Sequence, residues 1–199
     1  MKFLDCFCGL GGASEGFFRE GFDVTGIDIV NVGYPYRLIL GDMTKLKGED
    51  FKGYDVIWGS PPCRDFTRIP DHALRADGEK WRWKVPKDRE NGLLKVRAFL
   101  KFVEDAKPIF WVMENVSGLA ECLPDIKPRA YNCKILNGKR HVFYGNYPSF
   151  LMPMTVNDKL IFNYGGKLRA WERARIPLAC SQAFARACKE QLLEKEISP

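Results

Sequence analysis

Residues 2–12 read Lys2-Phe3-Leu4-Asp5-Cys6-Phe7-Cys8-Gly9-Leu10-Gly11-Gly12, an apolar run that leads directly into a cluster of glycines. The run predicts a short strand over Lys2–Phe7, and the glycines predict a tight turn. We expect Ser14 to cap a helix that extends from Ala13 to Glu20. Strand, glycine turn and helix in this order begin a βαβ unit, so we expect an α/β fold with a mostly parallel sheet flanked by helices.

The remainder of the chain continues the alternation of apolar runs and amphipathic segments. Further strands are predicted over Phe22–Ile29, Arg37–Leu40, Tyr54–Trp58, Ile109–Met113, Tyr131–Leu136 and His141–Tyr144. Helices are predicted over Gly92–Asp105 and over Glu172–Leu193, the latter interrupted by Pro177. The dipeptide Asn137-Gly138 predicts a hairpin between the last two strands.

Two acidic residues follow predicted strands, Asp28 after the second and Asp42 after the third. Ligands of open α/β sheets bind beyond the carboxyl ends of the strands, where an acid after a glycine turn is typical of a ribose contact. Capping of the next turn is the alternative. Phe7, beside the glycines, could stack on a flat ring or belong to the core.

The predicted strand Tyr54–Trp58 ends in Gly59-Ser60-Pro61-Pro62-Cys63. The two prolines stiffen the exit from the strand, so a thiol is held rigidly at its tip. A guanidinium from Arg64 would favour the reactive thiolate. Glu114 and Asn115 close another apolar strand, and an acid there must be paired or protonated to be buried. Glu114 is therefore a candidate acid or hydrogen-bond donor, with helix capping as the alternative.

Composition narrows the class of protein. The chain has 199 residues, enough for one domain with a core, and its hydrophobic content of 46% is ordinary for a globular protein. We expect no membrane span, because no apolar run is long enough, and no signal peptide. Seven unclustered cysteines favour a reducing cell interior, hence a cytoplasmic protein. Cys6-Phe7-Cys8 is too tight for a zinc site, so no metal is expected.

The formal charge of +6 is unevenly distributed. Basic residues gather between Arg64 and Arg97, with Trp81 and Trp83 among them; they are Arg68, Arg75, Lys80, Arg82, Lys84, Lys87, Arg89 and Lys95. Such a stretch suits a phosphate backbone and unstacked bases, although a solvated loop has the same composition.

Several segments in a fixed order resemble the C5-cytosine DNA methyltransferase family. They are Asp5–Gly12, Pro62-Cys63 and Glu114-Asn115-Val116, followed by Phe143–Pro148, similar to the segment after the family's Arg-x-Arg motif, and Ile176–Ala179, similar to its last conserved element. The resemblance spans nearly the whole chain and is weakest in the middle and between Leu151 and Ala170.

This resemblance implies a Rossmann-like, class I S-adenosylmethionine-dependent methyltransferase fold. Residues 1–150 and 171–199 would form the catalytic domain, and residues 151–170 a very reduced target-recognition or connecting segment. Sequence recognition would then be weak or depend on the basic stretch, a homodimer or a separate specificity subunit. Double-stranded DNA is the implied substrate, inside a bacterial, archaeal or virus-infected cell and in a restriction–modification context.

The resemblance also implies the cofactor S-adenosyl-L-methionine, released as S-adenosyl-L-homocysteine. Its adenine would lie near Phe7 and Asp42, its ribose near Asp28, and its methionine end over Gly9 and Gly11. The implied cofactor-binding residues are Phe7, Gly9, Gly11, Gly12, Asp28, Ile29, Asp42, Met43 and Pro61.

For catalysis, the resemblance implies that Cys63 attacks C6 of a flipped cytosine, which activates C5 for methylation. Glu114 would hold N3 and the exocyclic amine, and Arg140 would steady the base. Lys139-Arg140-His141 matches the Arg-x-Arg motif in two registers, so Lys139 and His141 remain alternatives for that role. The implied substrate or DNA contacts are Arg64, Arg68, Trp81, Arg82, Asn115 and Lys139.

Two other functions are compatible with the sequence. An RNA cytosine-5 methyltransferase would use the same chemistry, and basic and stacking residues do not separate RNA from DNA. A catalytically weak relative that only binds DNA or cofactor is the other alternative, although Cys63, Glu114 and Arg140 are all present. An amino-methyltransferase is disfavoured because Cys63 stands where such enzymes carry an aromatic residue.

Overall fold

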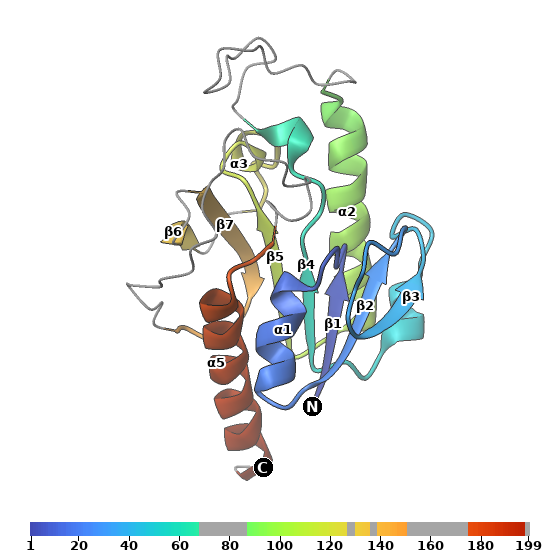
Figure 1. Cartoon of the computed structure of the whole chain (residues 1–199). Coiled ribbons are helices and arrows are strands. Elements are labelled where there is room, and N and C mark those ends of the chain that lie inside the picture. Colours follow the sequence, from blue (N-terminus) through green and yellow to red (C-terminus); the bar gives the residue numbers. More distant parts are fainter. Residues whose placement is uncertain (68–86, 127–129, 136–138, 151–174, 198–199) are drawn as a thin grey trace.

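A mixed sheet forms the centre of the computed structural model, which describes residues 1–67, 87–126, 130–135, 139–150 and 175–197 (Figure 1). Within these residues the sheet has seven strands in the order β3-β2-β1-β4-β5-β7-β6. The strands are β1 (Lys2–Cys6), β2 (Asp23–Asp28), β3 (Arg37–Leu40), β4 (Val56–Gly59), β5 (Phe110–Asn115), β6 (Ala130–Ile135) and β7 (Lys139–Asn146).

Strands β1 to β5 run parallel to one another, and β7 and β6 add an antiparallel edge. The strand order changes direction at β1, which pairs with β2 on one side and β4 on the other. The predicted α/β fold with a mostly parallel sheet is therefore confirmed. Sheets of this kind bind ligands beyond the carboxyl ends of the strands at which the order changes direction, here β1 and β4.

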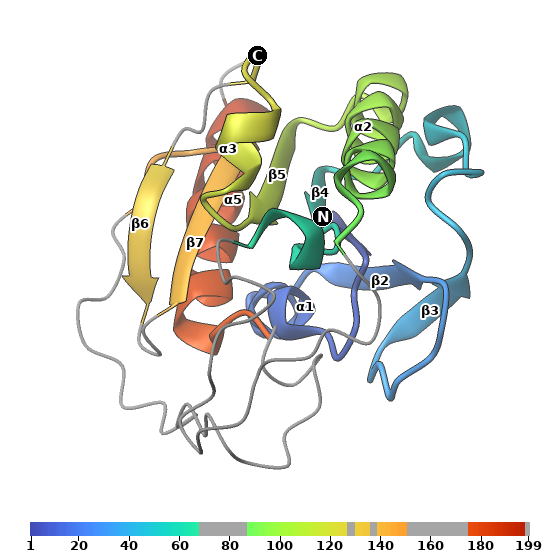
Figure 2. The same ribbon diagram turned by 90° about the horizontal axis from the view of Figure 1, so that it is seen from above.

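Helices cover both faces of the sheet. Helix α1 (Gly12–Arg19) and helix α5 (Leu178–Ile197) lie side by side on one face, while α2 (Arg89–Ala106) covers the other (Figures 1 and 2). Two short 3₁₀ turns, η1 (Gly48–Phe51) and η2 (Arg64–Phe66), and the single-turn helix α3 (Leu119–Cys122) complete the described elements.

Alternating strand residues build one core on each face, as the two-residue period of a strand requires. Phe3 and Trp58 pack with Phe184 of α5 on the α1–α5 side. Leu4 and Ile57 pack with the α2 residues on the opposite side. Because both faces are covered, these strands carry apolar residues on both faces.

The element boundaries differ from the prediction where a proline or a tertiary contact intervenes. The last helix begins only at Leu178, after Pro177, whose carbonyl accepts hydrogen bonds from the Cys180 and Ser181 amides. Ser14 is not the cap of α1, since the residue at that position is Gly11 and the Ser14 hydroxyl is buried against Asp5. The hairpin turn at Asn137-Gly138 lies outside the described residues, whereas β6 and β7 pair as predicted.

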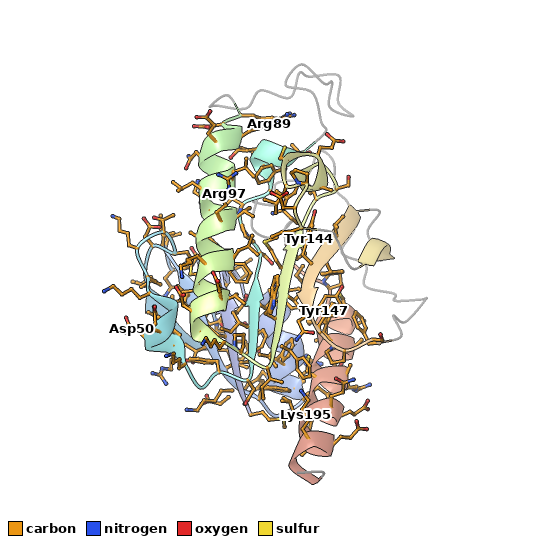
Figure 3. The ribbon with its side chains drawn as sticks, turned by 180° about the vertical axis from the view of Figure 1, so that it is seen from behind. Asp50, Arg89, Arg97, Tyr144, Tyr147 and Lys195 are labelled. Carbon is orange, nitrogen blue, oxygen red and sulfur yellow. The ribbon has the colours of Figure 1, made fainter. Side chains whose placement is uncertain are left out.

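Helix α2 carries basic side chains along its exposed surface (Figure 3). Arg89 lies at its first turn, at the end of the molecule where the parallel strands terminate, and Arg97 lies further down the helix. In the described part of the chain, no helix has the length and apolarity that membrane crossing requires. The same residues contain no cluster of three side chains suited to hold a metal ion.

Candidate active site

The Pro61-Pro62-Cys63 turn leaves β4 at the carboxyl edge of the sheet. The Ser60 amide donates to the Cys6 carbonyl at 3.1 Å, which extends the pairing of β4 with β1 by one residue. Pro61 is buried and Cys63 is half-buried. Cys63 precedes η2 with φ −90° and ψ −4°, so the chain turns directly after the thiol. The chain thus leaves β4 through the two prolines and turns at Cys63, and the rigidity of this exit stays a prediction.

Asn115 ties this turn to the neighbouring strand. Its Nδ2 donates to the Pro61 carbonyl at 3.0 Å, and its Oδ1 accepts from the Val116 amide at 2.9 Å. The Asn115 side chain is completely buried between β5 and the turn, and its contact with substrate stays a prediction. Its observed role is to hold the loop that carries Cys63.

Glu114, the residue before Asn115, contacts a histidine from the adjacent antiparallel strand. Nδ1 of His141 lies 2.7 Å from Oε1 of Glu114, and the side chains are 6% and 12% exposed. The expectation that an acid at this position is paired is confirmed. Lys139 and Arg140 belong to β7, but their side chains lie outside the described structure.

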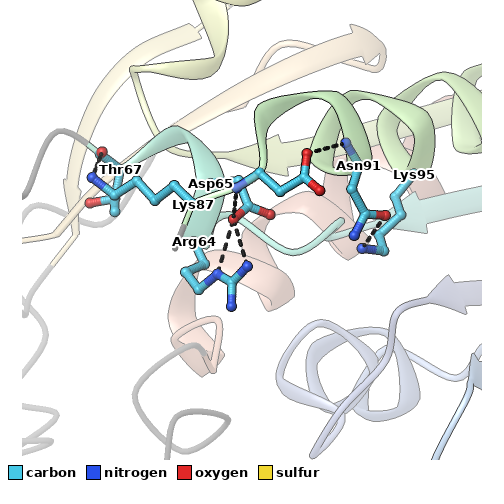
Figure 4. A network of polar contacts seen from close by, with 7 residues as sticks. Arg64, Asp65, Thr67, Lys87, Asn91 and Lys95 are labelled. Carbon is cyan, nitrogen blue, oxygen red and sulfur yellow. Dashed lines mark hydrogen bonds and ion pairs between the residues drawn. The ribbon is translucent and has the colours of Figure 1, made fainter. Parts of the chain in front are cut away.

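Arg64 does not stand free beside the thiol (Figure 4). Its Nη2 and Nε lie 2.8 and 3.0 Å from Oδ1 of the buried Asp65. The same oxygen accepts from the Asp88 amide at 3.1 Å, and Lys87 Nζ donates to the Thr67 carbonyl at 3.2 Å. Asp65 thus joins the Cys63 turn to the start of α2. Its carboxylate also offsets the positive charge of Arg64, which was predicted to favour the thiolate form of Cys63.

The glycine turn after β1 is attached to the end of β2. The Gly9 amide donates to Oδ2 of Asp28 at 3.0 Å. Phe7 adopts φ +60°, a strained conformation for a non-glycine residue. Gly9 has φ +52°, and a Cβ built on it would meet no atom of the described residues within 4 Å. The described residues therefore leave the position next to the Gly9 backbone open.

A buried chain of hydroxyls lies beneath this turn. The Ser14 hydroxyl donates to Oδ2 of Asp5 at 2.6 Å and lies 2.7 Å from the Tyr34 hydroxyl. All three side chains are buried, and burial raises the pKa of Asp5 to about 7. A Cβ on Gly11 would lie 3.1 Å from the Tyr34 ring. Gly11 is therefore needed for the close approach of Tyr34.

The other predicted cofactor residues differ in what they contact. Gly12 packs against the segment that precedes α5, since its Cβ would lie 2.5 Å from the Ile176 backbone nitrogen. Oδ1 of Asp42 accepts from the Thr44 amide and hydroxyl, which lowers the pKa of Asp42. The Met43 side chain is buried in the core, whereas Ile29 is 70% exposed at the end of β2.

Part of the predicted set of DNA-contacting residues lies outside the described structure. Arg68, Trp81 and Arg82 lie outside the described residues, as does the segment 151–170. Tyr34, Asp65 and Ser14 also contribute to the site. None of them was a predicted site residue, and Ser14 was predicted only as a helix cap. The contacts of Tyr34 and Asp65 join residues 20 and 23 positions apart, so no local pattern predicts them. For Asp65, its place directly after Cys63-Arg64 was a signal that could have assigned it to the site.

Comparison with known proteins identifies the family of the chain. The model of the family described as "C-5 cytosine-specific DNA methylase" matches residues 1–123. A "Probable DNA (cytosine-5)-methyltransferase" of Frog virus 3 is 30% identical over 118 residues, covering 58% of this chain and 53% of the relative. "Type II methyltransferase M.NgoPII" of Neisseria gonorrhoeae is 30% identical over 129 residues, covering 60% and 34%. The chain thus spans about half, or less, of these relatives' length.

A solved structure shares the fold. The crystal structure of a "putative DNA modification methyltransferase encoded within prophage" of E. coli superposes with a TM-score of 0.51 at 23% identity, covering 73% of this chain and 46% of that one. Since the family match includes the glycine turn, Cys63 and Glu114 and extends over more than half of the sequence, the chain belongs to the C-5 cytosine-specific DNA methylase family.

Proposed function

We propose that this chain transfers a methyl group from S-adenosylmethionine to C5 of a cytosine in DNA, through a covalent adduct with Cys63. One observation carries the proposal. The neighbouring strands β4 and β5 end in the Cys63 turn and in Glu114, and the Asn115–Pro61 hydrogen bond joins them. This arrangement supports the proposal because the proposed nucleophile and the proposed acid follow neighbouring parallel strands at their carboxyl ends, the same end of the sheet as the glycine turn.

Cys63 supplies the nucleophile. Its thiolate forms a bond to C6 of the cytosine, and the ring electrons move to C5, which then attacks the methyl group. Loss of the C5 proton and cleavage of the sulfur–C6 bond return the thiolate. Because C5 and C6 are out of reach inside a stacked duplex, the base must be flipped out. The stiff Pro61-Pro62 backbone supports this role by limiting the positions that the sulfur can take.

Glu114 is the proposed partner of the pyrimidine's polar edge. As C6 is attacked, negative charge develops on the ring, and a hydrogen bond or proton from Glu114 to N3 stabilises it. The remaining carboxyl oxygen can accept from the exocyclic amine. Burial of Glu114 strengthens both interactions because water competes less for the carboxyl group.

The glycine turn and the ends of β2 and β3 fit S-adenosylmethionine, which when bound supplies an electrophilic methyl group. The open space over Gly9 admits a ligand close to the backbone. Asp28 already accepts from the Gly9 and Val30 amides, and its remaining lone pairs are available to a ribose hydroxyl. Ile29 and Leu40 are 70% and 64% exposed and offer apolar surface to a flat ring.

Double-stranded DNA is the proposed substrate, with Arg64, Arg89 and the remainder of the basic stretch near its phosphates. Residues 151–170 remain the proposed connecting or target-recognition segment. A homodimer or a separate specificity subunit would supply further recognition. These assignments depend on family membership and on the charge distribution of the sequence.

Bisulfite sequencing of unmethylated genomic DNA, treated with the purified protein and S-adenosylmethionine, tests the function. We expect 5-methylcytosine in a short sequence context and none with Cys63→Ala, which should still bind the cofactor. Oligonucleotides that contain 5-fluorocytosine should trap a covalent adduct with the wild type only. Modification of RNA but not DNA would favour the RNA alternative, and wild-type turnover by Cys63→Ala would exclude the covalent mechanism.

A further inference from the structure

The contact between Glu114 and His141 joins two antiparallel strands at the proposed active site. Glu114 of β5 is paired in register with Phe143 of β7, and His141 lies two residues before Phe143, on the same face. Nδ1 of His141 and Oε1 of Glu114 are 2.7 Å apart. Both side chains are almost completely buried.

The imidazole is oriented by its surroundings. Its ring lies nearly parallel to the Phe143 ring, at 18° and with a centroid separation of 6.4 Å. Nε2 is buried and has no hydrogen-bond partner among the described residues. A neutral imidazole carries one hydrogen, and placing it on Nε2 would bury a donor without an acceptor in this part of the chain. The geometry therefore favours a hydrogen on Nδ1, donated to Glu114.

We propose that His141 is a positioning residue that gives the two carboxyl oxygens of Glu114 different tasks. The inference rests on the proposed function. Nδ1–H of His141 holds Oε1 as the accepting oxygen, so the proton that Glu114 offers to N3 of cytosine is carried by Oε2. Oε1 keeps a second lone pair for the exocyclic amine.

The physical reason lies in the hydrogen bond itself. A donor bound to one oxygen of a carboxyl group favours negative charge on that oxygen and therefore protonation of the other. It also fixes the rotation of the carboxyl plane, which a reaction with a flipped base requires. Without the bond, both oxygens would be equivalent and the group could turn.

This assignment changes which residue of the Arg-x-Arg segment acts. Arg140 was the predicted residue, with Lys139 and His141 as alternatives. A guanidinium has five donors and a permanent charge, whereas a neutral imidazole offers a single N–H and no charge. His141 thus provides one directed bond to Glu114, made inside the protein, rather than a charged clamp.

Two amide variants separate positioning from packing. In His141→Asn the amide nitrogen can occupy the place of Nδ1, and in His141→Gln it can occupy the place of Nε2. We expect His141→Asn to keep kcat within about 5-fold of the wild type and His141→Gln to lower kcat about 10- to 100-fold, as expected for loss of one hydrogen bond to a reacting group. KM for S-adenosylmethionine should be unchanged in both. Methyl transfer to unmethylated genomic DNA and the melting temperature are both measured for the wild type and for each variant.

Equal losses in the two variants, or no loss in either, would overturn the inference. A loss of kcat that follows the melting temperature across both variants would assign His141 to packing alone. Each of these results is distinct from failure of the proposed function, in which the wild type methylates no cytosine in DNA or RNA.

A second measurement does not depend on activity. The chain has only two histidines, His72 and His141, so ¹⁵N spectra of the imidazoles can be assigned with His72→Gln. We expect the Nδ1–H form of His141, with slow hydrogen exchange. Glu114→Ala should abolish that form, while Glu114→Gln, which retains a carbonyl acceptor, should preserve it. An Nε2–H form in the wild type would contradict the pairing whether or not the protein is active.

Discussion

Asn115 Nδ2 donates to the Pro61 carbonyl at 3.0 Å, and this bond joins two positions that are 54 residues apart in the sequence. It crosses from the end of β5 to the turn that presents Cys63. The side chain is completely buried, so the bond is shielded from water. The turn that carries Cys63 and the strand that carries Glu114 are therefore held in register by a side chain that is shielded from solvent.

Asn115→Ala should destabilise the protein by about 1–3 kcal/mol, because it leaves the Pro61 carbonyl buried without its donor. It should also slow covalent trapping by 5-fluorocytosine DNA. Asn146→Ala is a matched control, since Asn146 Nδ2 donates to the Ile109 carbonyl at 3.2 Å at an exposed position. Urea unfolding of both variants is the measurement. Equal changes in the free energy of unfolding would contradict the prediction that the buried Asn115–Pro61 bond stabilises the protein more than the exposed Asn146–Ile109 bond does.

Substitution by alanine at two glycines of the same turn, Gly9 and Gly12, should have different effects on stability and on cofactor binding. Gly12→Ala brings a Cβ to 2.5 Å from the Ile176 backbone and should cost about 1–3 kcal/mol of stability through overpacking. The Cβ of Gly9→Ala meets no atom within 4 Å in the part of the chain that the structure describes, so this variant should cost only about 1 kcal/mol, from strain at φ +52°. Its Cβ would, however, fill the space proposed for the cofactor.

Calorimetric titration with S-adenosylmethionine separates these effects. We expect Gly9→Ala to weaken cofactor binding at least 10-fold while the fold remains intact, and Gly12→Ala to lower the melting temperature first. A Gly9→Ala variant with normal cofactor affinity would remove the turn from the proposed binding site.

Asp5 should make stability depend on pH. Burial, with a contribution from the nearby Asp28 carboxylate, raises its pKa from 3.8 to about 7, although the Ser14 hydroxyl acts in the opposite direction. The folded chain therefore holds a proton that the unfolded chain releases. Below about pH 4 this contribution is fully present, and it is lost as the pH rises through 7, by up to about 4 kcal/mol.

The test compares the wild type with Asp5→Asn in urea between about pH 4 and pH 8. The difference between the two curves isolates Asp5 from the carboxylates whose pKa is lowered, such as Glu15 and Glu20. The free energy of unfolding of the wild type should fall relative to the variant as the pH rises. A constant difference would show that Asp5 is already ionised in the folded protein at the lower pH.

Asp65 should stabilise the connection between the Cys63 turn and α2. Asp65→Ala leaves the Asp88 amide and the Arg64 guanidinium without their shared acceptor, at a cost of about 2–4 kcal/mol. Asp65→Asn keeps an acceptor oxygen and should cost less. Glu104→Ala, which removes an exposed carboxylate on α2, should change stability by less than about 0.5 kcal/mol. Chemical denaturation of the three variants checks the order, and a loss in Glu104→Ala equal to that in Asp65→Ala would refute it.

DNA affinity should fall steeply with salt if the basic stretch contacts phosphates. Arg89→Gln should reduce the slope of log affinity against log salt by about one unit per lost phosphate contact. Arg19→Gln removes the same charge from α1, where Arg19 is paired with Glu15 on the other face of the sheet, and should leave the slope unchanged. Fluorescence anisotropy with a mixed-sequence duplex measures both. Equal slopes for the two variants would remove Arg89 from the proposed interface.

Local patterns in the sequence were enough to predict the central sheet and the order of its motifs. Apolar runs such as Phe3-Leu4 and Ile57-Trp58 predict buried strands because strand residues alternate between two faces, and both faces here are covered. Pro61-Pro62 fixes its own backbone, so the stiff presentation of Cys63 follows from the residues themselves. Glu114 at the end of an apolar strand required a partner for the same local reason.

Which partner Glu114 finds was decided only in the folded chain. His141 reaches it because β7 pairs antiparallel with β5 in one register, and a shift by one residue would turn His141 to the opposite face. Asp65 with Asp88, Asn115 with Pro61, and Tyr34 with Ser14 depend in the same way on distances between segments far apart in sequence. The sequence by itself determined the strands, the turn and the chemical groups at their ends. The tertiary structure alone decided which of those groups meet, because hydrogen bonds act over about 3 Å and no local pattern encodes such a distance.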